Sequence, residues 1–70
     1  MDNKVNDVGY NIRLIRKSLN LTQEQFADKL GVTRSAVQHW EDNYRQPGID
    51  MLRKMKEVYN ISYEEIIDGV

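Results

Sequence analysis

The sequence contains no cysteine, only one proline and only one histidine among its 70 residues. Without cysteine, neither a disulfide nor a thiolate metal site can form, and a reducing compartment is permitted. No apolar run approaches the roughly 20 residues needed to span a bilayer. The first residues, MDNKVND, have neither the basic nor the apolar region of a signal peptide. We therefore expect a soluble, cytoplasmic protein.

The residue patterns of catalytic sites are also missing. There is no cluster of metal-ligating residues and no glycine-rich loop that could cradle a phosphate, and His39 has no nucleophile pattern beside it. The glutamates of the capping regions are better explained by helix starts and helix dipoles than by acid–base chemistry. We predict that the protein is not an enzyme and that it uses no cofactor or metal.

The length predicts one domain over residues 1–70, with residues 1–6 as a flexible N-terminus. The net charge of −1 argues against nucleic-acid binding, because domains that bind phosphate are usually basic. The charge is unevenly distributed, however, since residues 9–47 carry +2 whereas residues 48–70 carry −2. A DNA-binding face in the first of these segments would have modest nonspecific affinity and would depend more on base contacts.

The pattern of residues 21–30 predicts a short helix with a well-defined start. Thr22 is a good N-cap, and Gln25 three residues later completes a capping box. Leu21 and Phe26 are spaced to form a hydrophobic staple around this cap. The predicted helix runs over residues 23–30.

A second helix is predicted to begin only three residues later. Gly31 stands where a chain leaving a helix commonly needs a positive φ, which glycine adopts at low cost. Thr33 is the next N-cap, and Val32 and Val37 form a second staple around it. So short a link forces the two helices to cross steeply, and Trp40, one turn beyond Val37, is expected in the core rather than as a stacking platform for a base.

Together, residues 22–43, TQEQFADKLGVTRSAVQHWEDN, closely resemble the helix-turn-helix of the phage-repressor and Cro (XRE-like) family of DNA-binding proteins. The resemblance extends back through NIRLIRKSLNLTQ, which is similar to the family's first helix with its paired arginines, and forward through EDNYRQPG to a C-terminal pair of helices. It implies an all-α, lambda-repressor-like bundle of five short helices, with the helix-turn-helix at helices 2 and 3. A prokaryotic or phage-encoded protein is also implied.

The chain departs from the family pattern at the end of the recognition helix. The family usually has Asn-Gly after the closing glutamate, whereas this chain has Asp42 and Asn43. Asparagine tolerates left-handed backbone geometry, so the turn is expected to survive. Asp42 is less favourable, because an uncompensated carboxylate repels a phosphate.

Three further helices are expected around the motif. Asp7 is a candidate N-cap for the first, and Ser62 with Glu65 predicts the start of a short last helix. A helix in between is predicted to begin near Ile49 and to end at Asn60. The expected core residues of the first helix are Val8, Ile12, Ile15 and Leu19. Those of the fourth are Ile49, Leu52, Met55 and Tyr59, with Met51 also assigned to core filling rather than to partner binding.

Candidate DNA contacts follow from placing the second helix of the motif in a major groove. Its outward and N-terminal side chains meet base edges, and these are Arg34, Ser35, Gln38 and His39. The resemblance implies phosphate contacts from Thr22, Gln23, Thr33, Asn43, Tyr44 and Arg45. It also implies a structural ion pair between Arg16 and Glu41, in which the guanidinium grips the carboxylate bidentately while facing a phosphate.

The expected partner is double-stranded DNA. One recognition helix reads too few base pairs for useful specificity, so we expect a homodimer, at least on DNA, that binds a palindromic operator as a repressor. The expected self-contact is Val58 together with residues 63–70, whose apolar side chains exceed what the last helix needs for its own core. The alternative is a protein-interaction or antitoxin-like regulatory module, which the low pI and the acidic C-terminal half support.

Overall fold

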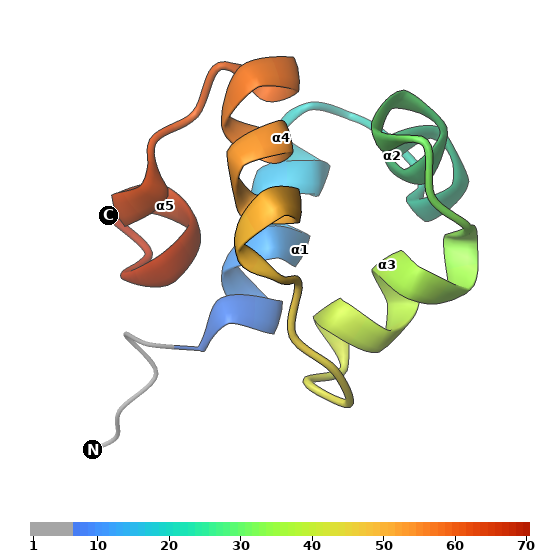
Figure 1. Ribbon diagram of the computed structural model, residues 1–70, viewed down its shortest axis with the longest axis horizontal. Coiled ribbons are helices and arrows are strands. Elements are labelled where there is room, and N and C mark those ends of the chain that lie inside the picture. Colours follow the sequence, from blue (N-terminus) through green and yellow to red (C-terminus); the bar gives the residue numbers. More distant parts are fainter. Residues whose placement is uncertain (1–6) are drawn as a thin grey trace.

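The computed structural model describes residues 7–70, and the expectation of a flexible segment over residues 1–6 lies outside this range. Five α-helices follow one another without a strand within residues 7–70: α1 (Val8–Ser18), α2 (Gln23–Leu30), α3 (Arg34–Glu41), α4 (Ile49–Tyr59) and α5 (Tyr63–Ile67). In Figure 1, α2 and α3 occupy one side of the molecule, α1 and α4 cross its middle, and α5 lies on the other side. The predicted all-α fold of five short helices is confirmed.

The helix starts form as the sequence predicts. Asp7 accepts a hydrogen bond from the backbone N–H of Tyr10, and Thr33 accepts one from the N–H of Ala36. Both capping boxes are present, with the Thr22 and Ser62 hydroxyls accepting from the backbone N–H groups three residues later. These bonds satisfy backbone donors that a helix start leaves without a partner. The first turn of each of these helices is therefore set by its own local sequence.

Several turns within residues 7–70 depend on left-handed backbone geometry. Gly31 has φ of 74° and ends α2, as predicted from its position after Leu30. Asn43 and Asn60 also adopt positive φ, at 60° and 55°, after α3 and at the end of α4. Asparagine is the non-glycine residue that adopts this region at lowest cost, together with aspartate. The departure from the family's Asn-Gly therefore leaves the turn intact.

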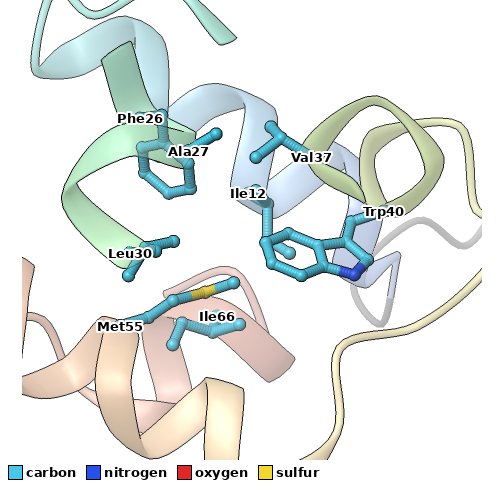
Figure 2. Packing of buried hydrophobic residues seen from close by; sticks show 8 residues of the cluster. All are labelled: Ile12, Phe26, Ala27, Leu30, Val37, Trp40, Met55 and Ile66. Atoms are coloured by element: carbon cyan, nitrogen blue, oxygen red, sulfur yellow. The ribbon is translucent and has the colours of Figure 1, made fainter. Parts of the chain in front are cut away.

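The core is a single cluster to which every helix contributes (Figure 2). Its members are Ile12, Phe26, Ala27, Leu30, Val37, Trp40, Met55 and Ile66. Trp40 is only 7% exposed and Met55 is fully buried, which confirms both as core residues. Met51 is partly buried and packs against the same cluster.

Two predicted core residues are not in the core. Leu19 is 39% exposed and Ile49 is 72% exposed. Leu19 is the C-cap of α1 and Ile49 is the first residue of α4, so both stand at helix ends. Helical periodicity identifies the face that a residue shares, but it does not show how far along that face the neighbouring helices extend.

Helices α2 and α4 are joined by an aromatic contact that also partly buries a hydroxyl. The rings of Phe26 and Tyr59 stack with centroids 4.5 Å apart and planes 3° from parallel. The Tyr59 hydroxyl donates a 2.7 Å hydrogen bond to the backbone carbonyl of Phe26. Burial raises the pKa of Tyr59 to about 12, because the phenolate would be poorly solvated there. This contact holds the end of α4 against α2, the first helix of the helix-turn-helix.

Two further findings apply to residues 7–70. No helix there has the length and apolar character needed to cross a membrane. The same residues contain no group of three or more side chains suited to hold a metal ion.

Candidate nucleic-acid interface

Helix α3 is amphipathic, and its two sides have different surroundings. Val37 is fully buried and Trp40 nearly so, and both pack into the core with Ala27 of α2. Arg34, Ser35 and Gln38 are exposed. Figure 2 shows Val37 and Trp40 pointing inward from this helix. The buried residues therefore fix the rotation of α3 about its axis and leave a polar face turned outward.

His39 differs from the other three predicted base contacts. It is half-buried, and its ring lies 4.9 Å from the ring of Tyr44 at 55°. The His39 carbonyl also accepts hydrogen bonds from the backbone N–H groups of Tyr44 at 2.9 Å and Arg45 at 3.2 Å. The Arg45 guanidinium lies 5.7 Å from the centre of the Tyr44 ring. His39 thus supports the loop after α3 while part of its side chain stays accessible.

The loop after α3 presents its own exposed groups. Tyr44 is 70% exposed, and Arg45 is also exposed. An open surface hollow lies between this loop and the outward face of α3, lined by Gln38, His39, Asp42, Asn43, Tyr44 and Arg45. Asp42, whose carboxylate would repel a phosphate, is among the residues that line this hollow. The structure therefore joins the end of the predicted base-reading face to the predicted phosphate-binding loop.

The N-termini of α2 and α3 carry three of the predicted phosphate contacts. Thr22 and Thr33 are exposed, and each hydroxyl accepts a capping bond but can still donate its hydrogen. The first backbone N–H groups of a helix have no partner within the helix and carry partial positive charge. Both helix starts can therefore attract an anion, whereas Gln23 is half-buried and engaged in the contacts described next.

An ion pair ties α1 to the end of α3, and it is the pair expected from the sequence. The Nε of Arg16 lies 2.6 Å from Glu41 Oε2, and its Nη2 lies 3.1 Å from Glu41 Oε1. The two side chains are only 11% and 4% exposed. A third nitrogen, Arg16 Nη1, donates to the carbonyl of Leu21 at 2.9 Å. This bidentate contact fixes the end of α3 and the chain entering α2 on the same guanidinium.

The ion pair continues towards the surface through Gln23, the first residue of α2. The side-chain Nε2 of Gln23 donates to Glu41 Oε1 at 3.1 Å. Its Oε1 accepts from Nη1 of the exposed Arg34 at 3.4 Å. Four side chains from three helices therefore form a continuous chain of contacts, which ends on a predicted base contact.

Sequence reasoning missed the contact between the start of α1 and the turn after α3. The Asn43 side chain accepts from the backbone N–H of Gly9 at 3.1 Å and donates to Asp7 Oδ1 at 2.8 Å. A Cβ atom on Gly9 would lie 2.4 Å from the carbonyl oxygen of Trp40. A glycine within a predicted helix was the available signal, because such a residue often marks a close approach of backbones. Asn43 keeps one amide hydrogen for an external acceptor.

Comparison with known proteins gives a consistent result. A helix-turn-helix family model matches residues 12–66. The chain is 31% identical to the HTH-type transcriptional activator BcrR of Enterococcus faecalis, over 83% of this chain and 28% of the relative. It is 34% identical to the uncharacterized HTH-type transcriptional regulator YqaE of Bacillus subtilis, over 84% and 51%. It is 28% identical to the antitoxin PezA of Streptococcus pneumoniae, over 86% and 38%.

The chain spans about half or less of the length of each of these three relatives. No solved structure matches it at a significant level. The family model nevertheless covers all of α2, α3 and α4 and most of α1 and α5. The structure has the two capped helices, the Gly31 turn and the amphipathic α3 that this match requires. The chain therefore belongs to the phage-repressor and Cro type of helix-turn-helix family, which is a family of regulators rather than enzymes.

Proposed function

We propose that this protein regulates transcription by binding a specific double-stranded DNA site with α3 in the major groove. One observation carries the proposal. The outward face of α3 offers Arg34, Ser35 and Gln38 to solvent, while the opposite face is anchored by buried residues. A rigid helix with exposed donors and acceptors at this position can present several side chains to base edges at once.

The chemistry of these side chains suits base recognition. Arg34 can donate two hydrogen bonds to O6 and N7 of guanine, and Gln38 can pair with N6 and N7 of adenine. Ser35 and the accessible part of His39 can donate to or accept from more than one base. We therefore assign base contacts to these four residues, with Arg34 as the most discriminating.

Phosphate contacts are proposed around this face. Thr22 and Thr33 stand at helix starts, where backbone N–H groups favour an anion, and Gln23 adds a side-chain amide. Arg45 supplies a full positive charge beside Tyr44, and the remaining amide hydrogen of Asn43 can reach an acceptor. Because the surrounding charge is only weakly positive, nonspecific affinity should be low and specificity should depend on base contacts.

A homodimer on a palindromic operator is the proposed binding form, because a single α3 spans few base pairs. The proposed self-contact lies in the C-terminal region, where apolar side chains remain accessible. Val58, Tyr63 and Ile67 are each about 40% exposed, and Val70 is 79% exposed. Sedimentation of the protein with a selected duplex should give two chains per site, and one chain per site would contradict the dimer.

We propose repression as the outcome of binding. A dimer on an operator that overlaps a promoter can exclude polymerase by occupancy alone, whereas activation needs a further contact surface. The relative from Enterococcus faecalis is named an activator, so a reporter assay is decisive. A reporter behind the selected site should lose expression when this protein is produced, and a gain of expression would contradict repression.

Selection of duplexes from a random pool tests the main proposal. We expect enrichment of one site with two related half-sites about one helical turn apart. Affinity for that site should fall steeply as salt concentration rises, because bound phosphates release counterions. A pool that stays random after repeated selection would contradict the proposal.

A second candidate function is a protein-interaction module of the antitoxin type. Its support is the acidic α5, which has Glu64 and Glu65 in its first turn and no basic residue in its last, together with the similarity to a protein named an antitoxin. Such an adaptor would bind no duplex at any salt concentration. The same salt titration therefore separates the two functions.

A further inference from the structure

An open groove lies between α1 and α5. From α1 it is lined by Asn11, Leu14 and Ser18, and from the C-terminal region by Glu65, Gly69 and Val70. The three residues of α1 recur at the spacing of one helical face. Leu14 is 48% exposed and Val70 is 79% exposed. Each wall of this α1–α5 groove therefore carries an accessible apolar side chain.

Asn11 fixes the two walls of the groove relative to each other. It is only 5% exposed, and its Nδ2 donates a 3.0 Å hydrogen bond to the backbone carbonyl of Ile66. A Cβ atom on Gly69 would lie 2.7 Å from Asn11 Oδ1, so the chain after α5 passes against the same amide. Since both contacts hold the C-terminal turn on α1, the groove is already formed in the single chain.

The two walls also carry opposite charges. Lys17 is exposed on α1, three residues after Leu14, and Asp68 is exposed at the end of α5. Within residues 7–70 neither side chain takes part in a hydrogen bond or an ion pair. Asp68 is the C-cap of α5, which has no basic residue in its last turn, so its carboxylate stands at the negative end of the helix dipole. A cation supplied by another molecule would stabilise it there.

We infer that the α1–α5 groove is the self-contact of the homodimer, in which a second copy of this chain is related to the first by a two-fold axis. The inference rests on the proposed function, which includes the dimer but names only the C-terminal region as its contact. A two-fold interface pairs a surface with itself, so that surface must be self-complementary. The groove meets this condition, because Leu14 can pack on Leu14 and Val70 of the second copy while Lys17 of each copy faces Asp68 of the other.

This contact leaves the proposed DNA-binding face accessible. Arg16 binds the end of α3 from α1, and Leu14 lies two residues before it, which is about 160° away around the helix axis. In Figure 1, α5 likewise lies on the other side of the molecule from α2 and α3. The groove is small, so we expect the dimer to be weak in the free protein and to form mainly when both copies occupy one duplex.

The chain has no cysteine, so a single introduced thiol reports the contact. Leu14→Cys places this thiol in the groove. Leu19→Cys is the matched control, because Leu19 is also an exposed leucine but does not line the groove. A disulfide requires two Cα atoms within about 7 Å of each other. On the selected duplex under mild oxidation, Leu14→Cys should form covalent dimers at least about tenfold faster than Leu19→Cys, because the contact raises the local thiol concentration.

A charge exchange tests the same contact without a disulfide. The quantity compared is the ratio of the affinity for the selected duplex to the affinity for a duplex with one half-site, which cancels any general effect of charge on DNA binding. Lys17→Glu and Asp68→Lys should each lower this ratio by about fivefold, because like charges then meet twice across the axis. The double variant Lys17→Glu/Asp68→Lys restores opposite charges and should recover most of the ratio.

Two results would overturn the inference while leaving DNA binding by α3 intact. One is equal cross-linking of the two cysteine variants on a duplex that holds two chains. The other is a double charge variant that loses as much as the two single variants combined. Absence of any preferred duplex for the unaltered protein would instead refute the proposed function. Circular dichroism spectra that match the unaltered protein would establish that each variant is folded.

Discussion

Replacing Gly9 by alanine should destabilise this protein, although alanine is normally the better residue in a helix. Gly9 lies in the first turn of α1, where its backbone meets the end of α3. An added Cβ would lie 2.4 Å from the carbonyl oxygen of Trp40 and 2.8 Å from that of Glu41. Both atoms belong to the backbone, so no flexible side chain can move aside. The start of α1 and the end of α3 would have to separate.

The expected change in the free energy of unfolding combines two destabilising contributions and one stabilising contribution. Overpacking of this kind costs about 1 to 3 kcal/mol. Separation also weakens the bond from the Gly9 N–H to Asn43 Oδ1, at about 1 kcal/mol. The higher helix propensity of alanine returns up to about 1 kcal/mol. We expect a net loss of about 2 kcal/mol, which lowers the melting temperature of a domain of this size by about 10 °C.

Gly48→Ala is the matched control. Gly48 has φ of −72°, and a Cβ added there meets no atom within 4 Å. Its stability should stay within about 0.5 kcal/mol of the unaltered protein, because two small effects oppose each other. Alanine lowers the conformational entropy of the unfolded chain, which stabilises the fold, but it is less favourable than glycine as an N-cap. Thermal and urea unfolding, followed by circular dichroism, measure both variants. If Gly9→Ala were as stable as Gly48→Ala, the close approach of α1 to α3 would be refuted.

The other predictions concern the ion pair, the partly buried phenol of Tyr59 and the two classes of DNA contact. Glu41→Ala leaves the Arg16 guanidinium buried without its partner and should cost about 3 kcal/mol in urea unfolding, whereas a loss below about 1 kcal/mol would show that the pair is not structural. The stability contribution of Tyr59 should be constant below pH 10 and should fall as the pH rises towards 12, because folding raises the pKa of Tyr59. Tyr59→Phe should therefore lose less stability than the unaltered protein between pH 9 and pH 11. An identical decline in both proteins would contradict this. Arg34→Ala should cost about 1 to 3 kcal/mol of binding and relax the preference at one base pair. Arg45→Ala should weaken binding to all sequences and flatten the salt slope by about one unit, and indistinguishable effects from these two variants would refute the division of roles.

Much of the fold is encoded in short segments, and those parts were predictable. Thr22, Thr33 and Ser62 cap their helices through residues three positions away, so the caps can be recognised without knowing the fold. Gly31 reveals the turn between α2 and α3, because its backbone angle is unfavourable for most other residues. The inward positions of α3 follow from helical spacing alone.

The remaining features depend on which segments meet in space. The exposure of Leu19 and Ile49 depends on where neighbouring helices stop, which periodicity does not encode. The bond from the Gly9 backbone N–H to the Asn43 side chain joins residues 34 positions apart, and neither residue type suggests the other. The same holds for Gln23, which was predicted only as a phosphate contact and is joined to both Glu41 and Arg34 in the structure.

The central claim is that the outward face of α3 meets the bases of DNA. Amide chemical shifts measured while a selected duplex is titrated into the protein test it most directly. The largest changes should fall on residues 33–39 and at the start of α2, with smaller changes at Tyr44 and Arg45. Changes concentrated on α5, with α3 unaffected, would contradict the account.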